Sequence, residues 1–265
     1  MMRSDAPAER NDGLANYLHG TRFGPIEWFR QLDSTNRYAS EAAIARAGDG
    51  LVVVADEQTA GRGRLGRTWE APPGASLLVS VLLRMGPSSD LRALATPAAA
   101  LAAADALHAL AGIDARLKWP NDLVVGERKI AGFLAEAVHG ASAVVVGMGL
   151  NVSWPAFPDE LADIATAANH CSDRPVDREP LLIEWLVRYD RRLRALAHPG
   201  GERELRDACA ARSATLGRRV RVELSNRALV GLASGLTSNG MLEVTSDDGA
   251  VEAVASGDVV HLRPA

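Results

Sequence analysis

The sequence predicts an α+β protein in which a larger domain of helices and strands precedes a small all-β domain. Helix-type and strand-type patterns are interleaved up to about residue 212, and only short alternating runs divided by turn signals follow. With 265 residues, 47% of them hydrophobic, the chain can bury a substantial core. We expect a flexible lead-in over residues 1–25, the larger domain over 26–212 and the small domain over 213–265.

The first elements of the larger domain are a helix and two buried strands. Ser34-Thr35 can cap a helix that runs to Gly48, because either hydroxyl accepts from free backbone N–H groups. The β-branched run 51–55 and the run 76–83 (SLLVSVLL) are typical of buried strands.

A second helix is expected from Thr96-Pro97, read as an N-cap followed by proline at the first helical position. The stretch 98–111 is nearly all Ala and Leu, which predicts a helix buried against a sheet. Strands are expected at 115–119, 130–138 and 143–148, and an amphipathic helix at 181–196.

The small domain is predicted from its spacing. Short alternating runs occur at 220–224, 242–244 and 259–262, and Asn239-Gly240 and Asp248-Gly249 are hairpin-type turns. This pattern indicates a small antiparallel barrel.

Composition narrows the function classes. The net charge of −4 gives no global argument for binding nucleic acid or an anionic membrane. No apolar run has the length of a membrane span, and the polar start, residues 1–11, lacks a signal-peptide core, so we expect a cytoplasmic protein without membrane attachment. Cys171 and Cys209 are expected to be free thiols, and the scattered histidines predict no metal bound directly by His or Cys.

The most unusual segment is residues 61–67 (GRGRLGR), with three glycines and three arginines after a strand. Glycine lets backbone N–H groups approach an anion, and arginine offers forked donors to carboxylate or phosphate. Such a loop should be mobile without a ligand; the alternative is a solvated basic loop. Residues 118–122 (KWPND) combine a cation, an indole, an amide and a carboxylate at a strand end, where the alternative is an ordinary β-turn.

Three weaker segments accompany these two. Lys129 starts an otherwise apolar strand in which Gly132 allows close approach, although a strand-end lysine is the common case. Residues 147–151 (GMGLN) suit a backbone pressed against a ligand, or a simple bulge. Residues 33–36 (DSTN) open the first helix and either contact a polar ligand or only cap the helix.

Taken together and in this order, these segments resemble the biotin protein ligase family. The matching pieces are DSTN at 33–36, EQTAGRGRLGRTW at 57–69, KWPNDL at 118–123, RKIAGFLAE at 128–136 and GMGLNV at 147–152. The loop 167–171 (AANHC) departs from the expected Ser-Leu after Thr166, outside these motifs. The resemblance covers about residues 26–262.

The resemblance implies a mixed-sheet catalytic domain similar to class II aminoacyl-tRNA synthetases and an SH3-like C-terminal barrel. It implies a ligase that uses ATP and Mg²⁺ to convert biotin into biotinyl-5'-AMP, then biotinylates a lysine of the carrier domain of a biotin-dependent carboxylase. The segment before Trp28 has no room for a helix-turn-helix domain, so we expect the short form without sequence-specific DNA binding, as a monomer or weak homodimer.

The resemblance also implies roles for individual residues. Lys129 and Arg64 are the expected catalytic residues, which stabilise charge at the reacting carboxylate and phosphate. The biotin contacts are expected from Ser34, Thr35, Asn36, Gln58, Gly61, Arg62, Gly63, Arg64, Lys129, Gly132 and Gly147. The nucleotide contacts are expected from Arg64, Arg67, Trp69, Lys118, Asn121 and Asn151, with Asp122 as a candidate for the Mg²⁺ environment.

Two alternatives stay open at this point. A lipoate or octanoate ligase would share the fold and the adenylation chemistry, but the motifs at 61–67 and 118–122 favour biotin. A non-enzymatic RNA- or anion-binding module would account for the arginine loop but would leave Lys129 and the KWPND turn without a role.

Overall fold

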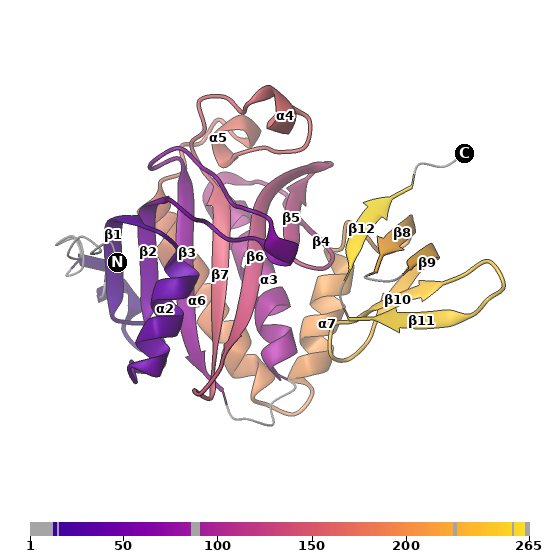
Figure 1. Cartoon of the computed structure of the whole chain (residues 1–265), viewed down its shortest axis with the longest axis horizontal. Helices are drawn as coiled ribbons and strands as arrows, with labels where there is room; N and C mark the ends of the chain where they lie inside the picture. Colours follow the sequence, from indigo (N-terminus) through magenta and orange to yellow (C-terminus); the bar gives the residue numbers. More distant parts are fainter. Residues whose placement is uncertain (1–12, 15, 86–90, 225–226, 256, 263–265) are drawn as a thin grey trace.

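A seven-stranded mixed sheet forms the centre of the computed structural model, which describes residues 13–14, 16–85, 91–224, 227–255 and 257–262 (Figure 1). Its strands are β1 (Ile26–Leu32), β2 (Val52–Gln58), β3 (Ser76–Arg84), β4 (Arg116–Lys118), β5 (Asp122–Val125), β6 (Arg128–Val138) and β7 (Ala143–Asn151). They lie in the order β1-β2-β3-β7-β6-β5-β4. Only β1 and β2 run parallel; every other pairing is antiparallel.

Helices cover both faces of this sheet. They are α2 (Thr35–Ile44), α3 (Leu91–Ala111), α6 (Arg178–Leu196) and α7 (Gly201–Ala211), with the short α4 (Asp159–Ala162) and α5 (Ala168–Cys171) beyond one end of the strands (Figure 1). Helix α2 packs on one face, and α3 and α6 pack on the other, so each face has its own hydrophobic core. Residues 92–111 of α3 are long and apolar enough for a membrane span, yet this stretch is mostly buried inside the fold.

The C-terminal part is a separate antiparallel sheet beside β4 (Figure 1). Its strands are β8 (Arg219–Glu223), β9 (Ala228–Leu236), β10 (Leu242–Thr245), β11 (Val251–Val254) and β12 (Asp258–His261), in the order β11-β10-β9-β8-β12. The turns at Gly240 and Gly249 join β9 to β10 and β10 to β11, and both glycines have a positive φ, of 80° and 84°. The α+β class with a mixed sheet followed by an antiparallel one is therefore confirmed.

The predicted start of the long helix is wrong. Helix α3 begins at Leu91, so Pro97 lies inside it rather than at its first position, and Thr96 is not an N-cap. The turn before Pro97 carries Leu94 and Ala95, which are buried in the core. Proline costs one backbone hydrogen bond, and burial of this additional apolar turn outweighs that loss.

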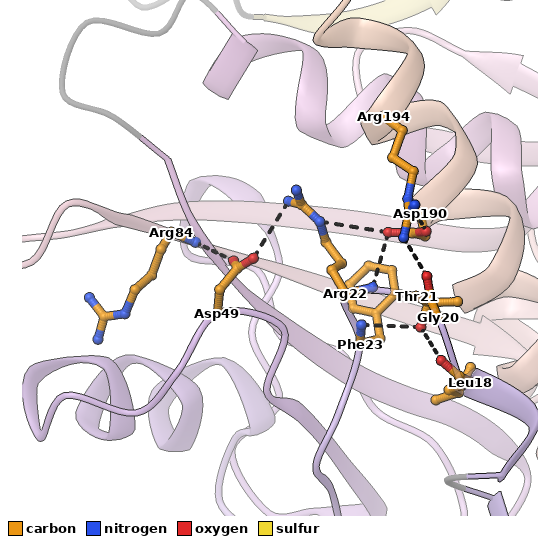
Figure 2. Close-up of polar contacts among 9 residues, drawn as sticks. All are labelled: Leu18, Gly20, Thr21, Arg22, Phe23, Asp49, Arg84, Asp190 and Arg194. Carbon is orange, nitrogen blue, oxygen red and sulfur yellow. Dashed lines mark hydrogen bonds and ion pairs between the residues drawn. The ribbon is translucent and has the colours of Figure 1, made fainter.

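The described residues 13–14 and 16–25 pack on the larger domain, whereas residues 1–12 and 15 of the expected flexible lead-in lie outside the described residues. A 3₁₀ helix, η1 (Asn16–Leu18), precedes a buried Phe23 whose ring stacks on Tyr189 of α6 with centroids 5.6 Å apart. Figure 2 shows the polar contacts beside it, where the backbone N–H of Arg22 donates to the buried Asp190 at 3.1 Å. A buried carboxylate requires partners, and this segment supplies one.

Candidate active site

A cavity of about 300 Å³ gathers most of the residues that the sequence singles out. It lies where the N-terminus of α2, the middle of β6 and β7, the loop 62–69, the turn 118–122 and β12 meet. Of the predicted site residues, its lining includes Ser34, Thr35, Asn36, Gln58, Arg62, Gly63, Arg64, Arg67, Trp69, Lys118, Asn121, Asp122, Lys129, Gly132 and Gly147. Gly61 and Asn151 are not part of the lining.

The floor of the cavity is a strip of bare backbone on β6 and β7. Gly132 pairs with Gly149, and Gly147 pairs with Leu134 on the neighbouring strand. A Cβ on Gly149 would come within 2.5 Å of the Trp69 ring, and a Cβ on Gly147 within 2.1 Å of the Asn36 amide oxygen. Glycine is required here because side chains from other elements lie directly on the strands.

One end of the floor is a hydrogen-bonded cluster at the N-terminus of α2. The Gln58 amide oxygen accepts from the Thr35 backbone N–H at 2.7 Å and from the Thr35 hydroxyl at 3.0 Å. Ser80 Oγ lies 2.6 Å from Asn36 Oδ1 and 2.7 Å from Thr35 Oγ1. Ser34 caps the helix by accepting from the Arg37 N–H. Gln58 is half-buried and the other side chains are buried. Their hydrogen bonds orient them mutually, so they form a rigid polar end wall.

The roof is the arginine loop, residues 61–69. It is a short hairpin closed by the bridge between Arg62 and Thr68, and its tip is a 3₁₀ turn, η2 (Arg64–Gly66), in which Leu65 has a φ of 55°. This left-handed conformation costs a non-glycine residue about 1–2 kcal/mol. The Leu65 side chain is 72% exposed, so no packing at the tip offsets that cost. The loop is therefore ordered by its ends rather than by a packed tip.

Each arginine of the loop contacts a different element. Arg62 forms an ion pair with Glu136 of β6 at 2.7 Å. Arg64 donates to the amide oxygen of Asn121 at 3.2 Å, and Arg67 forms an ion pair with Asp258 of β12. Burial lowers the pKa of the Arg64 guanidinium, while Asp258 and Asp122 act in the opposite direction. These contacts place three guanidinium groups over the same floor, and an anionic ligand can replace the present partner of each.

Lys129 reaches the cavity because β6 contains a bulge. The register with β5 shifts so that Ile130 is the extra residue between Ala131 and Lys129. Side chains alternate along a regular strand, so without the bulge Lys129 would face away from Gly132. Its Nζ instead lies 2.9 Å from the Cβ position of Gly132, 2.7 Å from an Asp122 carboxylate oxygen and 5.4 Å from the Trp69 ring centre.

The cavity is electropositive although the chain carries a net charge of −4. Five cations line it (Arg62, Arg64, Arg67, Lys118 and Lys129), against the two carboxylates of Asp122 and Asp258. Converging cations in a concave site attract anionic ligands. A neighbouring cavity of about 360 Å³ lies across the 118–122 turn, between α3, α7 and the β9–β10 hairpin. Its walls are mostly apolar, but Arg64, Lys118, Asn121 and Asp122 line both cavities, so the two adjoin along the 118–122 turn.

Two predicted residues serve the scaffold in this structure. Asn151 is buried, donates to the Thr166 carbonyl at 3.0 Å and accepts from the Trp154 indole at 3.1 Å. Gly61 lies beneath the loop, where a Cβ would come within 2.2 Å of the Trp69 carbonyl oxygen. The structure thus places neither residue on the cavity wall, and their ligand contacts remain predictions.

Sequence reasoning missed Ser80, Glu136 and Asp258. Ser80 is a polar residue inside the apolar run 76–83, which was a usable signal. Glu136 ends the quoted segment 128–136 without receiving a role. Asp258 gave no signal, because it reaches the cavity only when the C-terminal sheet packs beside the arginine loop.

A mixed sheet with a cation-lined cavity and a second antiparallel domain defines a known class of protein ligase. Residues 28–153 match the Biotin/lipoate A/B protein ligase family, and residues 215–262 match the Biotin protein ligase C terminal domain. The chain is 36% identical over 261 residues to the biotin–[acetyl-CoA-carboxylase] ligase of Mycobacterium tuberculosis, covering 93% of this chain and 94% of that protein. It belongs to the biotin protein ligase family.

Other relatives agree with this assignment. The bifunctional ligase/repressor BirA of Bacillus spizizenii is 32% identical over 234 residues, which are 86% of this chain and 71% of that protein. The biotin protein ligase from Aquifex aeolicus in complex with biotin and ATP superposes with a TM-score of 0.78 at 28% identity, covering 91% of this chain and 100% of that one. The biotin protein ligase fold is therefore shown over both parts of the chain.

Proposed function

We propose that this protein activates biotin with ATP to biotinyl-5'-AMP and transfers the biotin to a lysine of a biotin carboxyl carrier domain. The observation that carries the proposal is the cavity, in which a rigid polar end wall and a glycine floor face five cations, in a chain of the biotin protein ligase family. The end wall suits a compact polar ring system. The cations suit a carboxylate and phosphates.

In the first step a biotin carboxylate oxygen attacks the α-phosphate of ATP, and pyrophosphate leaves with the electron pair of the broken P–O bond. Negative charge grows on the phosphate oxygens in the transition state. Lys129 and Arg64 are the groups placed to stabilise it, because both face the floor and both hold partners that an anion can replace. In the second step a neutral carrier lysine attacks the acyl carbon, AMP leaves with the electron pair of the broken C–O bond, and the amine nitrogen loses a proton to solvent.

The biotin ring system is assigned to the end wall. Thr35, Asn36 and Gln58 present hydroxyl and amide groups there, and Ser34 lines the same wall. Gly132 and Gly147 carry no side chain, so Lys129 and the Asn36 amide can lie directly on these strands beside the ring. Arg62 and Gly63 of the loop line the cavity above this end, and Gly61 is proposed to contact biotin only through the closed loop.

The nucleotide is assigned to the other end, where Arg67, Lys118, Asn121 and Trp69 line the cavity. The Trp69 indole lies on the glycine floor, not in the hydrophobic core. Its Nε1 is buried beside Gly149 and has no hydrogen-bond partner among the described residues. Base–aromatic stacking contributes about 1–3 kcal/mol per base, and we expect the adenine to order this side chain further.

The residues present suit Mg²⁺ that arrives with the ATP phosphates. Asp122 is one carboxylate on the cavity wall, and its present partner is Lys129. No group of three or more His, Cys, Asp or Glu side chains that could hold a metal is found in the part of the chain that the structure describes. Asp122 would therefore contact the metal from one side, and Mg²⁺ would supply neutralisation of the phosphate charge.

The remaining assignments follow from the family. We propose that the carrier is the biotin carboxyl carrier domain of a biotin-dependent carboxylase. The name of the M. tuberculosis relative gives acetyl-CoA carboxylase as the substrate of that protein. We further propose a cytoplasmic protein without DNA or membrane partners, as a monomer or weak homodimer.

The proposal is tested by measuring biotin-dependent release of pyrophosphate from ATP, followed by mass spectrometry of an added biotin carboxyl carrier domain. We expect adenylate formation with biotin and a mass increase of one biotinyl group on the carrier. Lipoate and octanoate serve as matched substrates. Faster adenylation of either one than of biotin, or no adenylation at all, would contradict the proposed function.

A further inference from the structure

Glu136 joins the end wall of the cavity to the arginine loop. It lies on β6 two residues beyond Leu134, with a side chain 25% exposed. One carboxylate oxygen accepts from the Asn36 amide at 2.7 Å, and the other forms the ion pair with Arg62 at 2.7 Å. Asn36 belongs to α2 and Arg62 to the loop, so one side chain connects three elements.

The contact with Glu136 fixes the orientation of the Asn36 amide. Its two amide hydrogens go to the Glu136 carboxylate and to the Leu134 carbonyl oxygen at 3.2 Å. Both of these groups only accept, so rotation of the amide by 180° would oppose its oxygen to two other oxygens. The amide oxygen therefore stays on the Ser80 and Gly147 side, where it offers an acceptor to a ligand N–H.

The contact with Arg62 fixes the loop. Arg62 lies at the start of the hairpin and is bridged to Thr68 at its other end. An ion pair that fixes Arg62 therefore restricts the motion of both strands of the hairpin. Of the three arginine contacts, this one joins the loop directly to the sheet that forms the floor. The partner, Glu136, is charged and partly buried. Loss of the ion pair would leave the hairpin with the contacts of Arg64 and Arg67.

We propose that Glu136 is a positioning residue that orients the Asn36 amide for the biotin ring and holds the arginine loop closed over the adenylate. The inference rests on the proposed function. It separates two effects of one side chain: the Asn36 contact acts on biotin affinity, and the Arg62 contact acts on retention of biotinyl-AMP.

Two substitutions distinguish these effects. Glu136→Gln keeps an oxygen that accepts from Asn36 but turns an NH₂ group toward Arg62, so the ion pair is lost. We expect the biotin Kd of this variant to stay within about twofold of wild type and release of biotinyl-AMP to be about fivefold faster, the range of a partly exposed ion pair. Glu136→Ala removes both contacts and should also raise the biotin Kd, by roughly tenfold, as for a lost hydrogen bond to a charged group.

The experiment measures biotin Kd by titration calorimetry and adenylate release by a chase followed through tryptophan fluorescence. Arg62→Gln is made alone and together with Glu136→Gln. Because both changes break the same ion pair, the double variant should release adenylate no faster than the faster single variant. Glu184→Gln, which breaks a comparable Arg–Glu pair on α6 far from the cavity, is the matched control and should behave as wild type.

Two results would overturn the inference. One is that the effects of Glu136→Gln and Arg62→Gln on the rate of adenylate release multiply in the double variant; the other is that Glu136→Gln and Glu136→Ala lose biotin affinity equally. If Glu136→Ala does not fold, the Gln variant and the cycle with Arg62 still decide it. A wild-type protein that forms no adenylate from biotin and ATP contradicts the proposed function itself, whereas normal wild-type activity with unchanged Glu136→Gln contradicts only the role of Glu136.

Discussion

The floor and the roof of the cavity are built on opposite principles. The floor consists of paired strands whose glycines receive Trp69 and Asn36 at contact distance, and the side chains of its end wall are hydrogen-bonded to one another. The roof is a hairpin with an exposed tip, and each of its arginines has one partner on a different element. The floor has its shape before any ligand arrives. The roof holds contacts that anions can replace.

Because of this difference, we expect the floor and the roof to have different functions. A preformed floor binds and orients, because no reorganisation is needed when charge develops. A roof that exchanges partners encloses the intermediate and excludes water. Substitutions in the floor should therefore change the chemical step or substrate affinity, and substitutions in the roof should change retention of the adenylate.

The largest effect is expected for Lys129→Ala. Removal of a cation at the reacting centre should lower single-turnover adenylate formation by roughly 10²–10³-fold. Arginine should restore little, because its guanidinium is larger and planar. The double variant with Asp122→Asn checks whether the freed carboxylate is responsible, and it should remain slow. Near-normal formation by a folded Lys129→Ala protein would remove Lys129 from the mechanism.

Arg64→Ala should weaken retention of the adenylate in addition to slowing its formation. Loss of a charged hydrogen-bond donor over the intermediate should speed release of biotinyl-AMP by roughly 10–100-fold. Its only side-chain hydrogen bond among the described residues joins Asn121, so the thermal midpoint should move little. The assignment fails if the variant melts far below wild type and retains the adenylate normally.

Gly147→Ala should act on the floor. A Cβ there would meet the Asn36 amide oxygen at 2.1 Å and push the side chain from its place. Overpacking of this kind costs about 1–3 kcal/mol of stability. Displacement of the Asn36 amide should also lower biotin affinity by about tenfold, as for one lost hydrogen bond. Titration calorimetry measures the affinity. Gly48→Ala, at an exposed position with open space and no positive φ, away from the cavity, controls for a general effect of replacing glycine. Unchanged affinity would separate Asn36 from biotin recognition.

Asp258→Asn should have the smallest effect. The ion pair with Arg67 is largely exposed and is worth at most about 1 kcal/mol, so adenylate release should change by less than about fivefold. The change should disappear in a background of Arg67→Gln. A larger effect that persists in this background would show that the C-terminal sheet contributes more to the roof than this one contact.

The sequence predicted strands best where the pattern of apolar residues is regular. It missed β1 because Trp28 and Phe29 are adjacent and both buried, one in each hydrophobic core, so no alternation appears. A strand covered by helices on both faces loses the period of two. Pro97 misplaced the start of α3 because tertiary burial outweighed a local preference.

The candidate site divides in the same way. Residues inside contiguous motifs, such as Asn121 and Arg64, were predicted, since the motif itself brings them near the cavity. Glu136 and Asp258 act through partners that are distant in the sequence, and no local pattern marks such pairs. Likewise, the alternation of side chains gives no warning of the bulge that turns Lys129 toward Gly132.

The contrast between a rigid floor and an exchangeable roof is tested most directly by hydrogen exchange. Peptides covering residues 61–69 and residues 143–151 are followed in the free protein and with biotin and ATP. The account predicts fast exchange in the free loop that slows strongly once the adenylate forms, while β7 stays equally protected in both states. Equal changes in both peptides, or a loop already as protected as β7 without ligand, would contradict it.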